Sequence, residues 1–126
     1  MKRVVVAVCL LVAAVTAAVV LNVTLCRACD ELETDMAAVR TLAEAGDAQS
    51  AVTRFEETYR TWEKRSLLFH ALVDHGLMTE AEISMGKARH AAETGDLKTL
   101  ADEADDCAQT LRHIKVSSVP TADNIF

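Results

Sequence analysis

The chain has 126 residues and a formal net charge of −6 at pH 7. This length suits one small domain rather than two. An acidic chain is a poor partner for the phosphate backbone of nucleic acids, so we exclude nucleic-acid binding.

The first predicted element is a membrane-spanning helix over residues 4–25. The first 25 residues contain only two of the 13 basic residues, Lys2 and Arg3, and none of the 19 acidic ones. A helix rises about 1.5 Å per residue, so this segment can cross a hydrocarbon core of about 30 Å. We therefore assign residues 1–25 to an N-terminal tip and transmembrane anchor that contacts the lipid bilayer through residues 4–25.

A cleaved signal peptide is the alternative interpretation of the same segment. Its apolar region usually has about 7–15 residues and ends at a small-x-small cleavage site. The apolar run here is longer, and the best cleavage point, after Ala28, puts Cys26 at the minus-three position. We favour an uncleaved anchor. If the signal peptide is cleaved, the mature protein begins at Cys29.

The charges on either side of the span predict its orientation. Lys2 and Arg3 precede it, whereas several acidic residues follow Arg27. The positive-inside rule then places the N-terminus in the cytoplasm. We expect a single-pass protein of the cell membrane whose residues 26–116 form an extracytoplasmic domain.

Apolar residues recur at steps of three and four along the rest of the chain. No segment alternates with period two, so the pattern predicts an all-α fold. The predicted helices cover residues 4–45, 48–75, 80–94 and 97–115. We expect the first helix to leave the membrane without a break because no Gly or Pro interrupts it.

Short turns predict that neighbouring helices are antiparallel. Gly-Asp pairs at residues 46–47 and 95–96 each combine a helix-ending glycine with an aspartate that can cap the next helix. Gly76 is expected to end the second helix, and Thr79 with Glu82 has the spacing of a capping box for the third. We expect a small antiparallel helical bundle, with tetratricopeptide-like helical hairpins as the alternative.

Aromatic residues concentrate on one side of the second predicted helix, at Phe55, Tyr59, Trp62 and Phe69. Burying a large apolar side chain stabilises a fold by roughly 1.5–3 kcal/mol. The pattern predicts that this helix is the central member of the core. A groove for a ligand, lined by the same side chains, is the alternative.

Cys26 and Cys29 form a CxxC motif just after the span. Such a motif can be a redox pair, half of a zinc site or, when His follows, a haem attachment; here Asp30 follows. Positions i and i+3 of a helix face one side, so intermolecular disulfides in a dimer are a further option in an oxidising compartment. Unmodified thiols, a disulfide, and a redox or metal site that also uses His70 or His75 all stay open.

No catalytic arrangement stands out elsewhere in the sequence. His70 and Asp74 are four residues apart and share a helix face, but His75 points elsewhere, and zinc prefers three or four convergent ligands. We expect His75 in the last turn of the second helix, where a cation favours the negative end of the helix dipole. The sequence therefore predicts no enzyme, no cofactor and no metal.

A set of short motifs follows in a fixed order through the second half of the chain. They are Trp62 with the following Ser-Leu-Leu-Phe, Asp74-His75, Glu82-Ile83, Gly95-Asp96, His113-Ile114 and the final Asn124-Ile125-Phe126. In this order they resemble domain-of-unknown-function family 4363, which comprises small bacterial proteins with an N-terminal membrane anchor. The resemblance covers about residues 55–126. It implies no established activity and no catalytic residues.

The tail, residues 117–126, raises a separate question. Pro120 marks the end of the last helical pattern, yet the tail closes on Ile125 and Phe126. Together with the family resemblance, this ending favours a docked tail. We expect both apolar side chains to fold back into a groove of the bundle, with the Asn124 side chain bonding to backbone. The alternative is that the tail is a ligand for a partner protein.

The sequence thus predicts a membrane-anchored extracytoplasmic module with an interaction or structural role. Its expected partner is a membrane or envelope protein or a second copy of the chain. Two small-xxx-small spacings among Ala13, Ala14, Ala17 and Ala18, together with Asn22, permit close helix approach in a bilayer. The alternative function is a redox or metal-binding bundle that uses the CxxC motif. The candidate residues for partner or tail docking are Trp62, Phe69, His75, Asn124, Ile125 and Phe126.

Overall fold

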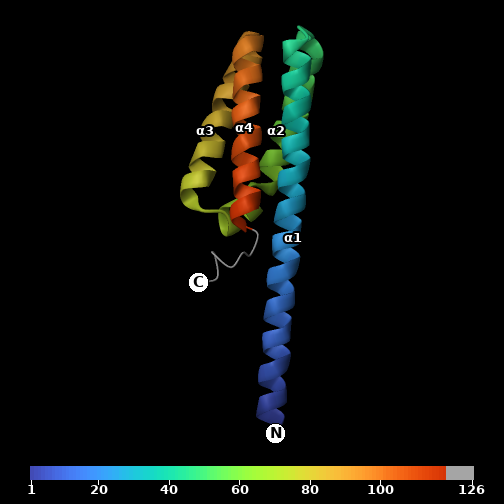
Figure 1. The fold of residues 1–126 in the computed structure, drawn as a ribbon, viewed down its shortest axis with the longest axis vertical. Helices are drawn as coiled ribbons and strands as arrows, with labels where there is room; N and C mark the ends of the chain where they lie inside the picture. The colour runs from blue at the N-terminus through green and yellow to red at the C-terminus, as the bar shows by residue number, and fades with distance from the viewer. Residues whose placement is uncertain (119–126) are drawn as a thin grey trace.

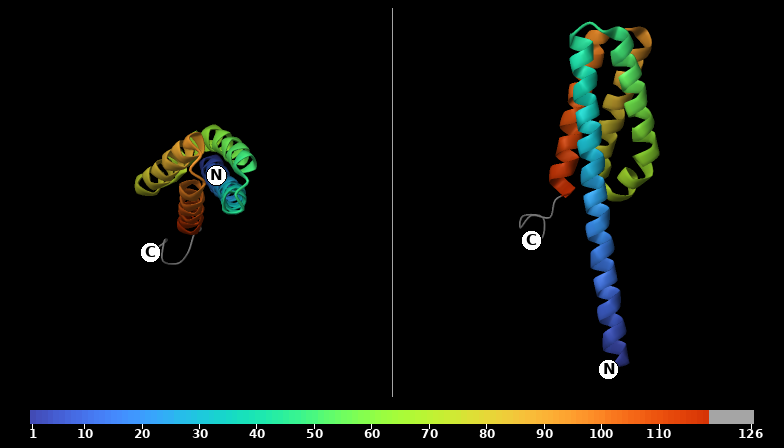
Figure 2. Two further views of the ribbon diagram at one scale, coloured as in Figure 1. Left: turned by 90° about the horizontal axis from the view of Figure 1, so that it is seen from above. Right: turned by 90° about the vertical axis from the view of Figure 1, so that its right-hand side faces the viewer.

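The computed structural model describes residues 1–118, which form four α-helices. These are α1 (Lys2–Glu44), α2 (Ala48–Leu72), α3 (His75–Thr94) and α4 (Leu97–Ser118). Successive helices run in opposite directions and form a bundle, and the first half of α1 extends alone beyond it (Figures 1 and 2). The prediction of an all-α fold is confirmed.

α1 changes character along its length without a break in its 43 residues. Its N-terminal half contains no buried residue, and the first buried side chain is Leu25. Further along, Leu32, Met36 and Val39 are completely buried in the bundle. Over the described residues, α1 is also the one helix that is long and apolar enough to cross a membrane. One helix therefore combines an exposed apolar rod with a core member of the bundle.

The core draws its side chains from all four helices. Its most extensive interface joins α1 to α4, and the least extensive of the main four joins α2 to α3. Phe55, Trp62 and Phe69 of α2 are buried as core residues. The prediction that α2 is the central helix was wrong, because α1 and α4 share the largest contact. A run of aromatic residues marks burial but does not show how many neighbours a helix has.

Both Gly-Asp turns form as predicted. Gly46 and Gly95 have φ angles of +80° and +73°, in the left-handed region that glycine tolerates best. The carboxylates of Asp47 and Asp96 each accept a hydrogen bond from the backbone N–H three residues further on, at 3.2 and 3.1 Å. Each turn therefore ends one helix and caps the next within two residues.

The junction between α2 and α3 lies earlier than predicted. α2 ends at Leu72, Val73 is extended, and the Asp74 carboxylate caps α3 by accepting a 3.0 Å hydrogen bond from the N–H of Gly76. Gly76 thus belongs to the first turn of α3, and the Thr79 hydroxyl bonds to backbone inside the helix. The predicted capping box was wrong because Asp74, a strong N-cap residue, starts the helix one turn sooner.

Two glycines of one hairpin provide a matched test of this backbone. Gly86 lies inside α3 and has open space where a Cβ would stand, whereas Gly95 has a positive φ. We expect Gly86→Ala to raise the free energy of unfolding by about 0.5–1 kcal/mol. Gly95→Ala should lower it by about 1–2 kcal/mol, because a Cβ disfavours the left-handed region. Urea unfolding of the full chain in detergent, followed by Trp62 fluorescence, measures both. If both substitutions change the free energy of unfolding in the same direction, the backbone conformations assigned to Gly86 and Gly95 are contradicted.

Candidate functional site

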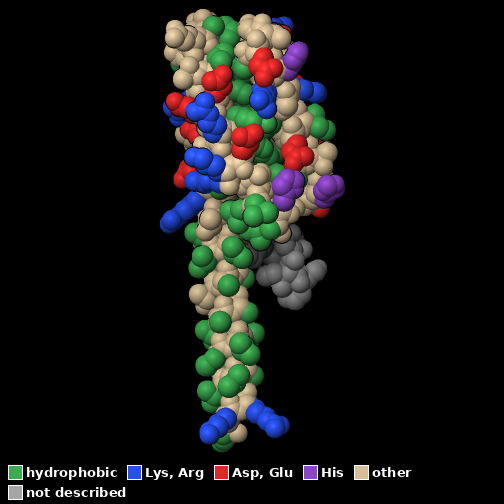
Figure 3. Space-filling view, turned by 180° about the vertical axis from the view of Figure 1, so that it is seen from behind, with side chains coloured by type: hydrophobic (Ala, Val, Ile, Leu, Met, Phe, Trp, Pro, Cys, Tyr) green, Lys and Arg blue, Asp and Glu red, His purple; other side chains and the backbone are tan. Residues whose placement is uncertain are grey.

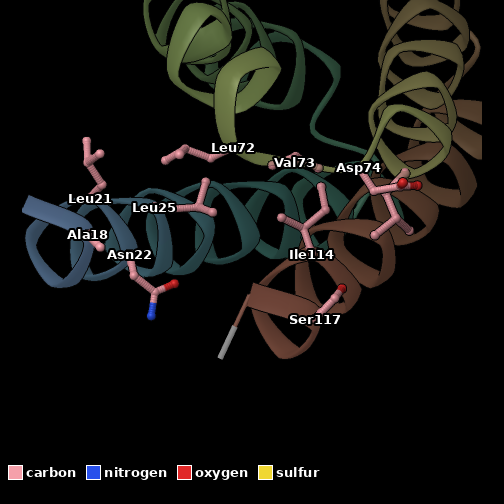
Figure 4. Close-up of a pocket in the computed structure, with 10 residues that line it drawn as sticks. Ala18, Leu21, Asn22, Leu25, Leu72, Val73, Asp74, Ile114 and Ser117 are labelled. Carbon is pink, nitrogen blue, oxygen red and sulfur yellow. The ribbon is translucent and has the colours of Figure 1, made fainter. Parts of the chain in front are cut away.

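A groove of about 340 Å³ lies where α1 leaves the bundle (Figure 4). Its walls come from α1, from the α2–α3 junction and from the last turns of α4. Figure 4 shows Leu25 of α1 pointing towards the junction at Leu72 and Val73, with Ile114 of α4 beside it. We call this space the junction groove. Its volume is at the lower end of the range for ligand pockets, about 300–1,000 Å³.

The lining of the junction groove is mostly apolar, with a few polar groups. Leu21, Leu72 and Leu77 contribute apolar side chains, and Asn22 and Asp74 contribute polar ones. The Asp74 carboxylate already accepts the N–H of Gly76. The Asn22 side chain is half-buried and has no hydrogen bond to any other residue of the described chain. Such a groove suits an apolar group that also offers a polar contact.

The end of the bundle around the groove is apolar as well. On the face seen in Figure 3, hydrophobic side chains gather at this end and along the free half of α1. Charged side chains are scattered over the rest of the bundle, on both sides of a narrower hydrophobic strip. Leu72 and Val116 are 39% and 62% exposed. The apolar surface of α1 therefore continues onto the underside of the bundle.

Acidic residues just beyond the span tie α1 to its neighbours. Each of four carboxylates on α1 forms an ion pair with a basic side chain of α2 or α4, at 2.6–2.8 Å. Exposed and partly exposed pairs of this kind add little to stability, so their main effect is to fix which faces meet. The pairs are Asp30–Lys115, Glu31–Arg65, Glu33–Arg112 and Asp35–Arg54.

The two thiols of the CxxC motif lie in different environments. Cys26 is half-buried, Cys29 is completely buried, and the four cysteines of the described chain are free. Burial, with Cys26 and Asp30 nearby, raises the pKa of Cys29 to about 12. Burial likewise raises the pKa of Cys107 to about 12. Because the thiolate is the nucleophile and the metal ligand, Cys29 can act as either only by leaving the core.

The two candidate histidines lie on different helices. His70 is in the last turn of α2, and its Nε2 lies 3.0 Å from Oε1 of Glu82 on α3. His75 is the first residue of α3, so its predicted place at the C-terminal end of a helix was wrong. Asp74 sits in the junction and does not share a helix face with His70. Over residues 1–118, no three His, Cys, Asp or Glu side chains come together in a way that could hold a metal.

Trp62 and Phe69 pack on each other inside the bundle. Their ring centroids are 5.1 Å apart, and they are 5% and 0% exposed. The structure therefore places both in the core rather than on a docking surface. The remaining candidates, residues 124–126, lie outside the described residues.

Comparison with known protein families gives a match that covers most of the chain. The sequence profile of Domain of unknown function (DUF4363) matches residues 19–125. The chain belongs to this family. The DUF4363 match begins within the apolar half of α1, includes the rest of the bundle and runs past α4. It thus takes in every residue named above for the junction groove. No curated protein and no solved structure matched the chain.

The burial of two thiols gives this DUF4363 protein a defined labelling pattern. We expect iodoacetamide at pH 8 to modify Cys26 in the folded, detergent-solubilised chain and to spare Cys29 and Cys107. The reason is that the pKa of both buried thiols is about 12, so little thiolate forms at that pH. Peptide mass spectrometry measures the modification, with the urea-unfolded chain as the control for full labelling. Rapid modification of Cys29 in the folded chain contradicts its burial.

The same two thiols predict a loss of stability in alkali. Folding raises the pKa of Cys29 and Cys107 from 9.0 to about 12. Above pH 9 the unfolded chain therefore releases protons that the folded chain keeps, and the free energy of unfolding falls as pH rises towards 12. Urea unfolding between pH 8 and 10.5 measures this slope. The variant with both Cys29→Ala and Cys107→Ala is the control and should show a shallower slope; an equal slope rules out this linkage.

Proposed function

We propose that this protein is a single-pass membrane protein that presents its helical bundle on the extracytoplasmic side as an interaction or structural module. It acts beside a membrane or envelope protein or a second copy of itself and carries out no catalysis. The observation that supports this proposal best is the composition of α1. One unbroken helix is apolar and exposed in its first half and is buried in the bundle in its second.

The exposed half of α1 favours insertion into a bilayer. Leu10 and Leu11 are 66% and 64% exposed, and the valines around them are similarly exposed. Apolar surface in water costs about 25 cal/mol per Å², and a patch of this size marks an interaction or membrane surface. A bilayer removes this cost along the whole segment. The basic Lys2 and Arg3 at the far tip and the acidic residues after the span favour a cytoplasmic N-terminus.

The position of the bundle on α1 favours a partner in or near the same membrane. Leu25 is the last residue of the predicted span and also the first buried residue of α1 in the bundle. No linker separates the two parts, so the bundle stands directly on the membrane surface. Rigid mounting of this kind limits the reach of the bundle. Close partners, including a second span that packs on the small residues of α1, fit this geometry best.

The redox or metal-binding alternative has weaker support. Cys29 is buried with a raised pKa, and His70 is paired with Glu82. Either function requires a rearrangement that moves Cys29 out of the core. Metal analysis of the purified chain, with thiol counting under native conditions, separates the two proposals. A bound metal, or a Cys26–Cys29 disulfide that reacts reversibly, favours the alternative.

Two single-cysteine variants test the topology. In a background without the native cysteines, we expect Leu67→Cys on the exposed surface of α2 to react with a membrane-impermeant maleimide on intact cells. A cysteine inserted after Met1 should react only after the membrane is permeabilised. The reverse pattern overturns the orientation. Release of the chain by carbonate, with a mature N-terminus at Cys29, shows a cleaved signal peptide instead of an anchor.

A further inference from the structure

We propose that residues 124–126 of this chain, Asn-Ile-Phe, occupy the junction groove. α4 brings the chain to the edge of this groove, since Ser117 is one of the groove residues and α4 ends at Ser118. Eight further residues, 119–126, follow in the sequence. An extended chain spans at most about 3.3–3.6 Å per residue, so these residues can reach any part of the groove. This inference goes beyond the proposed function and does not depend on it.

The apolar lining of the groove matches the side chains of this segment. Leu21, Leu72 and Leu77 line it, and Leu72 stays 39% exposed within the described structure. Ile125 and Phe126 are the two large apolar residues at the end of a segment that is otherwise small or polar after Pro120. Burying both of them together with the lining removes apolar surface from water on either side of the contact.

Asn22 favours a peptide over a lipid acyl chain as the occupant. Asn22 lines the groove, is half-buried as a residue, and has no hydrogen bond from its side chain to another described residue. No unpaired side-chain N or O atom of the described residues is buried, so this amide still reaches solvent. A group that covers it must supply both an acceptor and a donor, because an amide buried without partners is costly. A peptide backbone, or the side chain of Asn124, offers both, whereas an acyl chain offers neither.

Covalent attachment favours this segment over a separate protein. A short flexible link holds a ligand at an effective concentration in the millimolar range, so weak contacts suffice to occupy a site. The DUF4363 match also continues through residue 125, which assigns the segment and the groove to the same domain. The chain therefore carries its own ligand within reach of the groove.

Photo-crosslinking from position 126 tests this proposal directly. Phe126 is replaced by p-benzoylphenylalanine in the full-length chain in membranes, and adducts are mapped by mass spectrometry after irradiation. We expect intramolecular adducts within residues 18–25 or 72–77. Leu72→Asn, which alters the groove, should reduce them several-fold. Leu67→Asn changes an 81% exposed leucine of the same helix that does not line the groove, and it should leave them unchanged.

Each other outcome of this experiment overturns the proposal. Adducts with lipid show that position 126 enters the bilayer, and adducts with a second copy or another protein show that the segment is a ligand for a partner. Groove adducts that survive Leu72→Asn, or no adduct at all, are equally incompatible with occupancy of this groove.

Thermal unfolding gives an independent measurement on the same segment. We expect Phe126→Ser to lower the Tm of the full-length chain in detergent by about 4–8 °C, the shift typical of losing one modest contact in a small domain. Ala122→Ser is the control within the segment and should leave the Tm unchanged. In the Leu72→Asn background the effect of Phe126→Ser should shrink, because the contact is already weakened. An unchanged Tm for Phe126→Ser overturns the proposal.

Discussion

The continuity of α1 is the constraint on which the rest of the structure depends. A 43-residue helix without Gly or Pro has no point at which it can bend freely, so its two halves share one axis. The first half is apolar on every side, whereas the second is apolar on one face only. The change at Leu25 therefore decides both where the exposed rod ends and where the bundle begins.

The ion pairs beyond Leu25 hold α2 and α4 in defined positions around α1. Asp30 and Glu33 meet α4, whereas Glu31 and Asp35 meet α2, so neighbouring positions on one helix select different partners. This alternation fixes the rotation of α1 within the bundle. Because the axis continues into the exposed rod, the same pairs also fix which face of the rod lies beneath the α2–α3 junction.

The sequence predicts features that depend on neighbours along the chain and misses those that depend on distant partners. Helical spacing and the turns at Gly46 and Gly95 are local, and both predictions are correct. The start of α3 failed because two local signals competed, and the cap at Asp74 overrode the one at Thr79. The ion pairs were not foreseen, since the α1 pairs join residues 19 to 85 positions apart. A groove was expected, but its place was not, because residues of all four helices line it. Nothing in the acidic run after the span shows where its basic partners lie.

The groove follows from a mismatch in helix length at one end of the bundle. α2 ends and α3 begins beside Leu25, and α4 ends close by (Figure 4). α1 continues alone beyond them (Figure 1). Three helix ends beside one continuing helix leave a corner that none of them covers. Its walls are mostly apolar because α1, the α2–α3 junction and α4 all contribute apolar side chains to it. In the membrane topology that we propose, this corner lies where the span meets the bundle, between hydrocarbon and water.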